Sequence, residues 1–130
     1  MREEFVEAVL AVVGLVPPGS VLAYGDVAEL LGSGGPRQVG AVMSRDGGEV
    51  PWWRVVRASG EPPQGHERRA LACYEAESTP LRGDPRNGPW RVDIARARWA
   101  PTQAELAAVE AVAELLASRE VSDPRGGMEP

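Results

Sequence analysis

The chain has no lysine, one cysteine and one histidine among its 130 residues. The lone Cys73 cannot form an internal disulfide, and with only His66 beside it we expect no metal site and no histidine-based triad. The sequence also lacks an apolar run of about 18 residues and a leader-like N-terminus. These absences predict a soluble, cytoplasmic protein without a metal or other cofactor.

Acidic residues outnumber basic ones, and the net charge is −5. Residues 101–130 carry six acidic residues against two arginines, so the rest of the chain is close to neutral. Every basic residue is an arginine, a side chain suited to bidentate phosphate contacts and to stacking. An all-arginine composition can equally reflect codon usage, so charge neither supports nor excludes a DNA partner.

The periodicity predicts a mainly helical domain. We expect a helix from Arg2 that stops at Gly14 and Pro17–Gly19, and then a short extended segment over residues 20–24. Two further helices follow over residues 25–35 and 35–48, the first with Asp26 as its N-cap and the second with Pro36 near its first position. Two short helices joined by a glycine-rich turn have helix-turn-helix spacing, which alone is a weak signal.

The second half of the chain alternates short elements with loops. Residues 49–61 predict a strand or tight loop before a turn, and residues 66–77 predict a helix with Leu71 and Tyr74 inward. We expect a polar connection over residues 78–89, then a short strand and a closing element over residues 90–99. Thr102 and Glu105 form a capping box for a helix over residues 101–120. Its apolar stripe comprises Leu106, Val109, Val112 and Leu116.

Three motifs in order carry a family resemblance: "VPPGSVLAYGDVA", "PRQVGAVM" and "VPWWRVV". Together they resemble the DNA-binding domain of alkylguanine–DNA alkyltransferases, over about residues 5 to 99. The resemblance implies a winged helix-turn-helix-like fold, mainly α with a small β element, plus an extra C-terminal helix. We therefore predict an alkyltransferase-like DNA-binding domain over residues 1–100, an amphipathic helix over residues 101–120 and a disordered tail over residues 121–130.

The motif departs from the enzymes at two positions. Trp52 stands where they have the nucleophilic cysteine, and Trp53 where they have the histidine that activates it. An indole has no titratable nucleophile, so the chain is not expected to be an enzyme. Glu75 matches the acid that orients the histidine, and Cys73, on another helix, is expected to be a buried hydrophobe. The Cys-to-Trp change is typical of alkyltransferase-like proteins.

That resemblance implies a non-enzymatic sensor of double-stranded DNA that carries an alkyl group on the 6-oxygen of guanine. It flips the base and flags it for nucleotide excision repair. Arg37 matches the arginine that intercalates, and Tyr24 the tyrosine that crowds the target phosphate. The implied DNA-contacting residues are Tyr24, Gly35, Pro36, Arg37, Gln38 and Gly40.

The implied lesion pocket comprises Tyr24, Met43, Trp52, Trp53 and Val55, on a scaffold of Pro51, Arg54 and Glu75. Trp53 either lines this pocket or fills the volume of the missing histidine. Relatives read the base with an arginine in the following loop, but the segment "GEPPQGH" has none, with Gly65 near the expected place. Either Trp53 or His66 substitutes for that arginine, or lesion discrimination is altered.

Other interpretations remain open. A transcription regulator on undamaged DNA would use base-reading side chains on the same helix, such as Gln38, Ser44 and Arg45. A degenerate scaffold would bind only a protein partner. The C-terminal helix could dock on the domain, mediate dimerisation or contact a repair protein, and we expect docking and a monomer.

Overall fold

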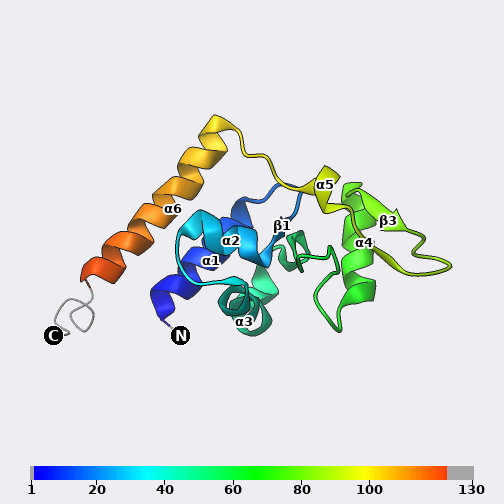
Figure 1. Cartoon of the computed structure of the whole chain (residues 1–130), viewed down its shortest axis with the longest axis horizontal. Coiled ribbons are helices and arrows are strands. Elements are labelled where there is room, and N and C mark those ends of the chain that lie inside the picture. The colour runs from blue at the N-terminus through cyan, green and yellow to red at the C-terminus, as the bar shows by residue number, and fades with distance from the viewer. Residues whose placement is uncertain (1, 123–130) are drawn as a thin grey trace.

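Figure 1 shows an elongated molecule in which a central group of helices lies between one long helix and a small hairpin-bearing unit. The computed structural model describes residues 2–122. The helices are α1 (Glu3–Leu15), α2 (Tyr24–Leu31), α3 (Pro36–Asp46), α4 (Glu67–Glu77), α5 (Ile94–Ala97) and α6 (Gln103–Ser122), with 3-10 turns η1 (Gly47–Glu49) and η2 (Trp52–Arg54). The strands are β1 (Leu22–Ala23), β2 (Val55–Val56), β3 (Leu81–Gly83) and β4 (Trp90–Val92). The predicted mainly helical fold with a small β element is confirmed.

Helices α2 and α3 form the predicted helix-turn-helix. The turn between them needs glycine at residue 34, where φ is +71° and an added Cβ would lie 2.8 Å from Cζ of Phe5. Pro36 occupies the first turn of α3, as expected. Asp26 is not the N-cap: α2 begins at Tyr24, and the Asp26 carboxylate reaches back to accept a hydrogen bond from the backbone N–H of Ala23 at 2.8 Å.

Two small sheets are formed within residues 2–122, one between the two halves of the chain and one within the second half. β1 and β2 pair in parallel, with Leu22 opposite Val55 and Ala23 opposite Val56. β3 and β4 form an antiparallel hairpin, with Leu81 opposite Val92. The prediction of an irregular connection over residues 78–89 is therefore wrong for its first half, because β3 pairs with a strand that lies beyond the turn.

Helix α6 packs along α1 and α2, at the side of the molecule away from the hairpin (Figure 1). The predicted capping box is present: Glu105 N–H donates to Oγ1 of Thr102 at 3.1 Å, and Thr102 N–H donates to Oε1 of Glu105 at 2.9 Å. Val109 and Leu116 are buried in the same core as α1, whereas Leu106 is 37% exposed. The helix thus docks on the domain. The expected tail falls mostly on residues 123–130, which lie outside the described residues.

The hydrophobic core is divided into two clusters. The larger lies among α1, α2, α3 and α6 and includes Phe5, Val39 and Trp99. The smaller lies around α4 and the hairpin, where Val56, Tyr74 and Val92 are buried and Trp52 and Trp53 pack against them. The tryptophan pair therefore sits on the hairpin side of the helix-turn-helix. None of the helices within residues 2–122 is long and apolar enough to cross a membrane.

Candidate nucleic-acid interface

The two adjacent tryptophans lie on a single 3-10 turn. Pro51 precedes the turn with φ −71°, and the turn closes where the Arg54 N–H donates to the Pro51 carbonyl at 3.0 Å. β2 follows at once and fixes the end of the turn against β1. The indoles of Trp52 and Trp53 are nearly perpendicular, at 89°, with ring centroids 5.6 Å apart. The two side chains face different surroundings.

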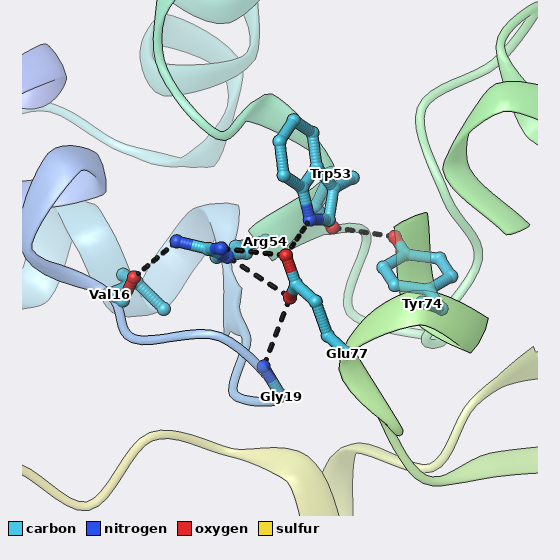
Figure 2. A network of polar contacts seen from close by, with 6 residues as sticks. All are labelled: Val16, Gly19, Trp53, Arg54, Tyr74 and Glu77. Atoms are coloured by element: carbon cyan, nitrogen blue, oxygen red, sulfur yellow. Dashed lines mark hydrogen bonds and ion pairs between the residues drawn. The ribbon is translucent and has the colours of Figure 1, made fainter. Parts of the chain in front are cut away.

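Trp53 faces a network centred on the carboxylate of Glu77, shown in Figure 2. Nε1 of Trp53 donates to Oε2 of Glu77 at 2.9 Å, and Nη2 of Arg54 donates to the same oxygen at 2.6 Å. Oε1 accepts from Nε of Arg54 at 3.2 Å and from the backbone N–H of Gly19 at 3.0 Å. Nη1 of Arg54 also donates to the Val16 carbonyl at 2.9 Å. The network joins the turn to α4 and to the loop after α1.

The electrostatics of this network favour an ionised Glu77. Burial would raise the pKa of this carboxyl, but hydrogen bonds from Arg54, Gly19 and Trp53 outweigh burial and lower it. Tyr74 adds a further tie, because its hydroxyl donates to the Trp53 carbonyl at 2.6 Å (Figure 2). Hydrogen bonds from several directions therefore hold the turn in place, and none of them requires Glu77 to be protonated.

The acid that supports the turn is not the one the sequence predicted. Glu75 was expected in the scaffold, but its side chain is exposed on α4. Glu77, two residues further along the helix, provides the carboxylate instead. Arg54 keeps its expected scaffold place, between a backbone carbonyl and Glu77. Pro51 is half-buried at the start of the turn.

Trp52 faces an open cavity of about 630 Å³ on the opposite side of the turn. The cavity lies between the second half of α3 with η1 and the segment that leads into α4. Its lining consists of Tyr24, Gly40, Met43, Ser44, Arg45, Gly47, Gly48, Trp52, Pro63, Gln64, His66 and Arg69. This volume is within the range of about 300–1,000 Å³ typical of small-molecule sites.

Two of the predicted pocket residues lie elsewhere. Val55 is fully buried in the core with β2, so it cannot form a wall of the cavity. Trp53 points into the Glu77 network and does not line the cavity, which agrees with the interpretation that it fills the volume of the missing histidine. Tyr24, Met43 and Trp52 do line the cavity.

The indole of Trp52 contacts one guanidinium and one imidazole ring. The Arg69 guanidinium carbon lies 5.4 Å from its ring centroid, and the His66 ring lies 5.6 Å away at a tilt of 56°. Arg45 lines the cavity from α3, and no acidic side chain lines it among the residues that the structure describes. Arg69 was missed from the sequence. The pattern that could have indicated Arg69 is its spacing. Arg69 follows His66 by three residues, so both lie on one face at the start of α4.

Tyr24 stands at the junction of β1 and α2. Parallel pairing places Ala23 beside Val56, so Tyr24 comes close to Arg57, the residue after β2. Burial raises the pKa of the Tyr24 hydroxyl, and the positive charge of Arg57 only partly offsets this rise. Its hydroxyl is therefore neutral at physiological pH and is able to donate a hydrogen bond.

The start of α3 presents the remaining predicted contact residues. Arg37 is exposed and makes no hydrogen bond or ion pair within residues 2–122. Gln38 is also exposed, but its Oε1 accepts a hydrogen bond from the Gly35 N–H at 3.0 Å and so caps the helix. Pro36 is exposed and Gly40 lies at the cavity. One helix thus carries an exposed guanidinium at its start and a cavity wall further along.

Cys73 lies half-buried on α4 and is not part of the cavity lining. Burial, with a smaller contribution from Glu77, raises the pKa of its thiol, so the protonated form dominates near neutral pH. No group of three or more His, Cys, Asp or Glu side chains could hold a metal ion within the described part of the chain.

Comparison of the chain with known proteins finds relatives that are named for base flipping. It is 36% identical over 106 residues to a DNA base-flipping protein of Escherichia coli (strain K12), covering 75% of this chain and 76% of that protein. A DNA base-flipping protein of Vibrio parahaemolyticus is 32% identical over 62 residues, which are 45% of this chain and 62% of the relative.

Solved structures show the same fold. S. pombe Atl1 in complex with damaged DNA containing O6-carboxymethylguanine has a TM-score of 0.66 at 28% identity, over 78% of this chain and 100% of that chain. S. pombe ATL in complex with DNA gives a TM-score of 0.65 with the same identity and coverage. The family model of the 6-O-methylguanine DNA methyltransferase DNA-binding domain matches residues 4–79. These residues contain α1 without its first residue, α2 to α4, and every residue that lines the cavity. The chain therefore belongs to this family, among its alkyltransferase-like members.

Proposed function

We propose that the protein is a non-enzymatic sensor of DNA damage. It binds double-stranded DNA in which guanine carries an alkyl group on its 6-oxygen, and it receives the flipped base in the cavity beside Trp52. The observation that carries this proposal is the open cavity of about 630 Å³, placed on α3 of a helix-turn-helix and walled by an indole. A base and an alkyl substituent fit a site of this size.

The residues around the cavity support recognition without alkyl transfer. The indole of Trp52 has no pair of electrons that could displace an alkyl group as a thiolate does. The one cysteine, Cys73, lies outside the cavity lining, and burial raises the pKa of its thiol. Incubation with DNA that carries a labelled alkyl group should leave no label on the protein, and label on Cys73 would contradict this part of the proposal.

We propose that Arg37 and Tyr24 assist base flipping. Flipping costs a few kcal/mol, less for a damaged pair. The exposed Arg37 guanidinium at the start of α3 can occupy the gap and stack on the orphaned base. Tyr24, at the cavity, is placed to contact the backbone of the flipped nucleotide. Stacking between a base and an aromatic side chain returns roughly 1–3 kcal/mol.

The alkyl group adds a smaller gain from burial. Each buried methylene contributes about 0.8 kcal/mol, so a methyl group favours the damaged base by only a few-fold. Larger alkyl groups have room in the cavity and gain more. The preference from burial alone is thus expected to reach tens-fold at most.

The biological consequence belongs to the same proposal. A bound protein that cannot remove the lesion serves as a flag, and nucleotide excision repair is the pathway that we propose to respond. We also propose a monomer, because α6 buries Val109 and Leu116 against its own domain. The cytoplasmic location stays a prediction.

The test is a binding titration on duplexes that differ in a single O6-methylguanine. Wild-type protein should bind the damaged duplex more tightly, and Arg37→Ala should weaken binding to both duplexes without lowering thermal stability. Equal affinity for the two duplexes would contradict the proposal. Binding that follows base sequence would favour a transcription regulator, but Ser44 and Arg45 lie in the cavity wall and Gln38 caps its helix. Absence of DNA binding would favour a protein-binding scaffold.

A further inference from the structure

We infer that Arg69 makes the cavity selective for guanine adducts whose substituent on the 6-oxygen carries a negative charge. This inference rests on the proposed function and specifies the class of lesion. The ligand it identifies is a base with a carboxylate on a short alkyl arm, and the residue that reads it comes from α4.

Arg69 lies against the indole of Trp52. Its guanidinium carbon lies 5.4 Å from the ring centroid of Trp52, within the range of a cation–π contact. Trp52 is itself held between the edge of Trp53 and the tilted ring of His66. α4 is tied to the same turn, through Tyr74 and Glu77. The guanidinium and the cavity wall thus belong to one connected unit.

The contact with Trp52 leaves Arg69 able to bind an anion. Stacking uses the face of a guanidinium, whereas its N–H groups point outward in the plane of the group. Those N–H groups can donate two parallel hydrogen bonds to a carboxylate, which a neutral alkyl group cannot accept. The inferred selectivity follows from this difference in hydrogen bonding and charge.

The charges around the cavity point in the same direction. Arg45 lines it from α3, and Arg69 lines it from α4. The acidic residues of α4 lie outside the cavity lining. Oε2 of Glu67 accepts from the Gly65 N–H at 3.1 Å, and Glu77 pairs with Arg54. An anionic adduct, which the phosphates of DNA repel, gains an attraction here that a neutral adduct lacks.

The experiment compares two adducts of nearly equal size. One duplex carries O6-carboxymethylguanine, a second carries its neutral amide O6-carbamoylmethylguanine, and a third carries guanine. Wild-type protein should bind the carboxymethyl duplex about ten-fold more tightly than the amide duplex, which corresponds to about 1.4 kcal/mol. Because Arg69 is exposed, this ratio should shrink as salt is added.

Substitution at two neighbouring positions assigns the effect. Arg69→Gln should bring the ratio close to one, while Arg68→Gln, at an exposed position outside the cavity lining, should leave it unchanged. A general loss of phosphate contacts would lower all three affinities together and leave the ratio intact. The ratio therefore reports on the adduct alone.

The outcomes separate this inference from the proposed function. Equal affinity of the wild type for the two adducts, or a preference that persists in Arg69→Gln, would overturn the inference. If both adducts still bound more tightly than guanine, the damage sensor would stand. If neither adduct bound more tightly than guanine, the proposed function itself would fail.

Discussion

The two sides of the turn at Trp52–Arg54 differ in how their side chains are held. On the α4 side, Trp53 and Arg54 converge on Glu77 with hydrogen bonds of 2.6 to 3.2 Å. On the cavity side, Trp52 contacts the Arg69 guanidinium at 5.4 Å and the rings of Trp53 and His66 at 5.6 Å, and it borders the open cavity. One side is a closed polar network, and the other borders an open cavity.

The difference shows which part of the enzyme motif a tryptophan can replace. A histidine at residue 53 would donate a hydrogen bond to the acid of α4, and the indole N–H of Trp53 makes such a bond to Glu77 at 2.9 Å. A cysteine at residue 52 would supply a nucleophile, which an indole cannot. Trp53 can therefore make the hydrogen bond to the acid of α4, whereas Trp52 offers no thiolate as an alkyl acceptor.

The largest expected effect is loss of the Glu77 carboxylate. In Glu77→Ala the guanidinium of Arg54, only 14% exposed, would be left without its partner. Removal of one member of a buried ion pair costs about 3–5 kcal/mol, so we expect a fall of about 3 kcal/mol in the free energy of unfolding measured with urea. Glu75→Ala is the matched control, since Glu75 is exposed on the same helix and should cost less than about 0.5 kcal/mol. Equal losses in both variants would contradict the assignment of Glu77.

Truncation on the cavity side should affect binding. Trp52→Ala removes the aromatic wall, and we expect affinity for an O6-alkylguanine duplex to fall by about 1–3 kcal/mol. Fluorescence anisotropy with labelled duplexes measures this change. Unchanged lesion affinity in a variant that remains folded would show that the base does not enter at Trp52.

A smaller effect is expected for Trp53→Phe, which keeps an aromatic ring but loses the N–H donor to Glu77. Loss of one such bond typically costs about 1 kcal/mol, and somewhat more when the acceptor is charged. Thermal unfolding should report this loss, whereas lesion affinity should stay close to that of the wild type. A fall in affinity as large as that of Trp52→Ala would mean that the two sides are not distinct.

The smallest effect concerns pH. Hydrogen bonds lower the pKa of Glu77 in the folded protein despite its burial, so the unfolded chain takes up this proton at a higher pH than the folded chain does. The stabilisation is therefore complete above the ordinary value of 4.5 and is lost as pH falls through the lowered pKa. As the pH is lowered from about 6 to about 3, the free energy of unfolding should fall less in Glu77→Gln than in the wild type. Parallel curves would contradict this assignment.

The sequence predicted the elements whose signals are local. The capping box at Thr102 and the stop of α1 before Pro17 depend on neighbouring residues, and both are seen. The short strand expected at the start of residues 90–99 is seen as β4, but its partner β3 was missed, because β3 has only three residues within a Pro- and Gly-rich segment and is stabilised by pairing with β4. The place of the hairpin is fixed by Gly60, whose carbonyl accepts from the Val92 N–H at 2.9 Å.

Errors at the site have a geometric origin. A shift of two residues along a helix rotates the side chain by about 200°, so Glu75 and Glu77 point to nearly opposite faces. No rule based on neighbouring residues chooses between them, because the choice depends on where α4 meets the turn. Val55 was misplaced because an apolar residue beside a pocket motif can face the core as easily as the cavity. Arg69 was overlooked because its partner, Trp52, lies in a different element.

The most direct test of the distinction between the two sides is a double-mutant cycle that pairs each tryptophan with the lesion. Affinities are measured for wild type, Trp52→Ala and Trp53→Phe, each on an O6-methylguanine duplex and on the unmodified duplex. We predict a coupling energy of at least about 0.5 kcal/mol between Trp52 and the methyl group, and none between Trp53 and the methyl group. Zero coupling at Trp52, or equal coupling at both positions, would contradict the assignment of the cavity beside Trp52 as the site that receives the damaged base.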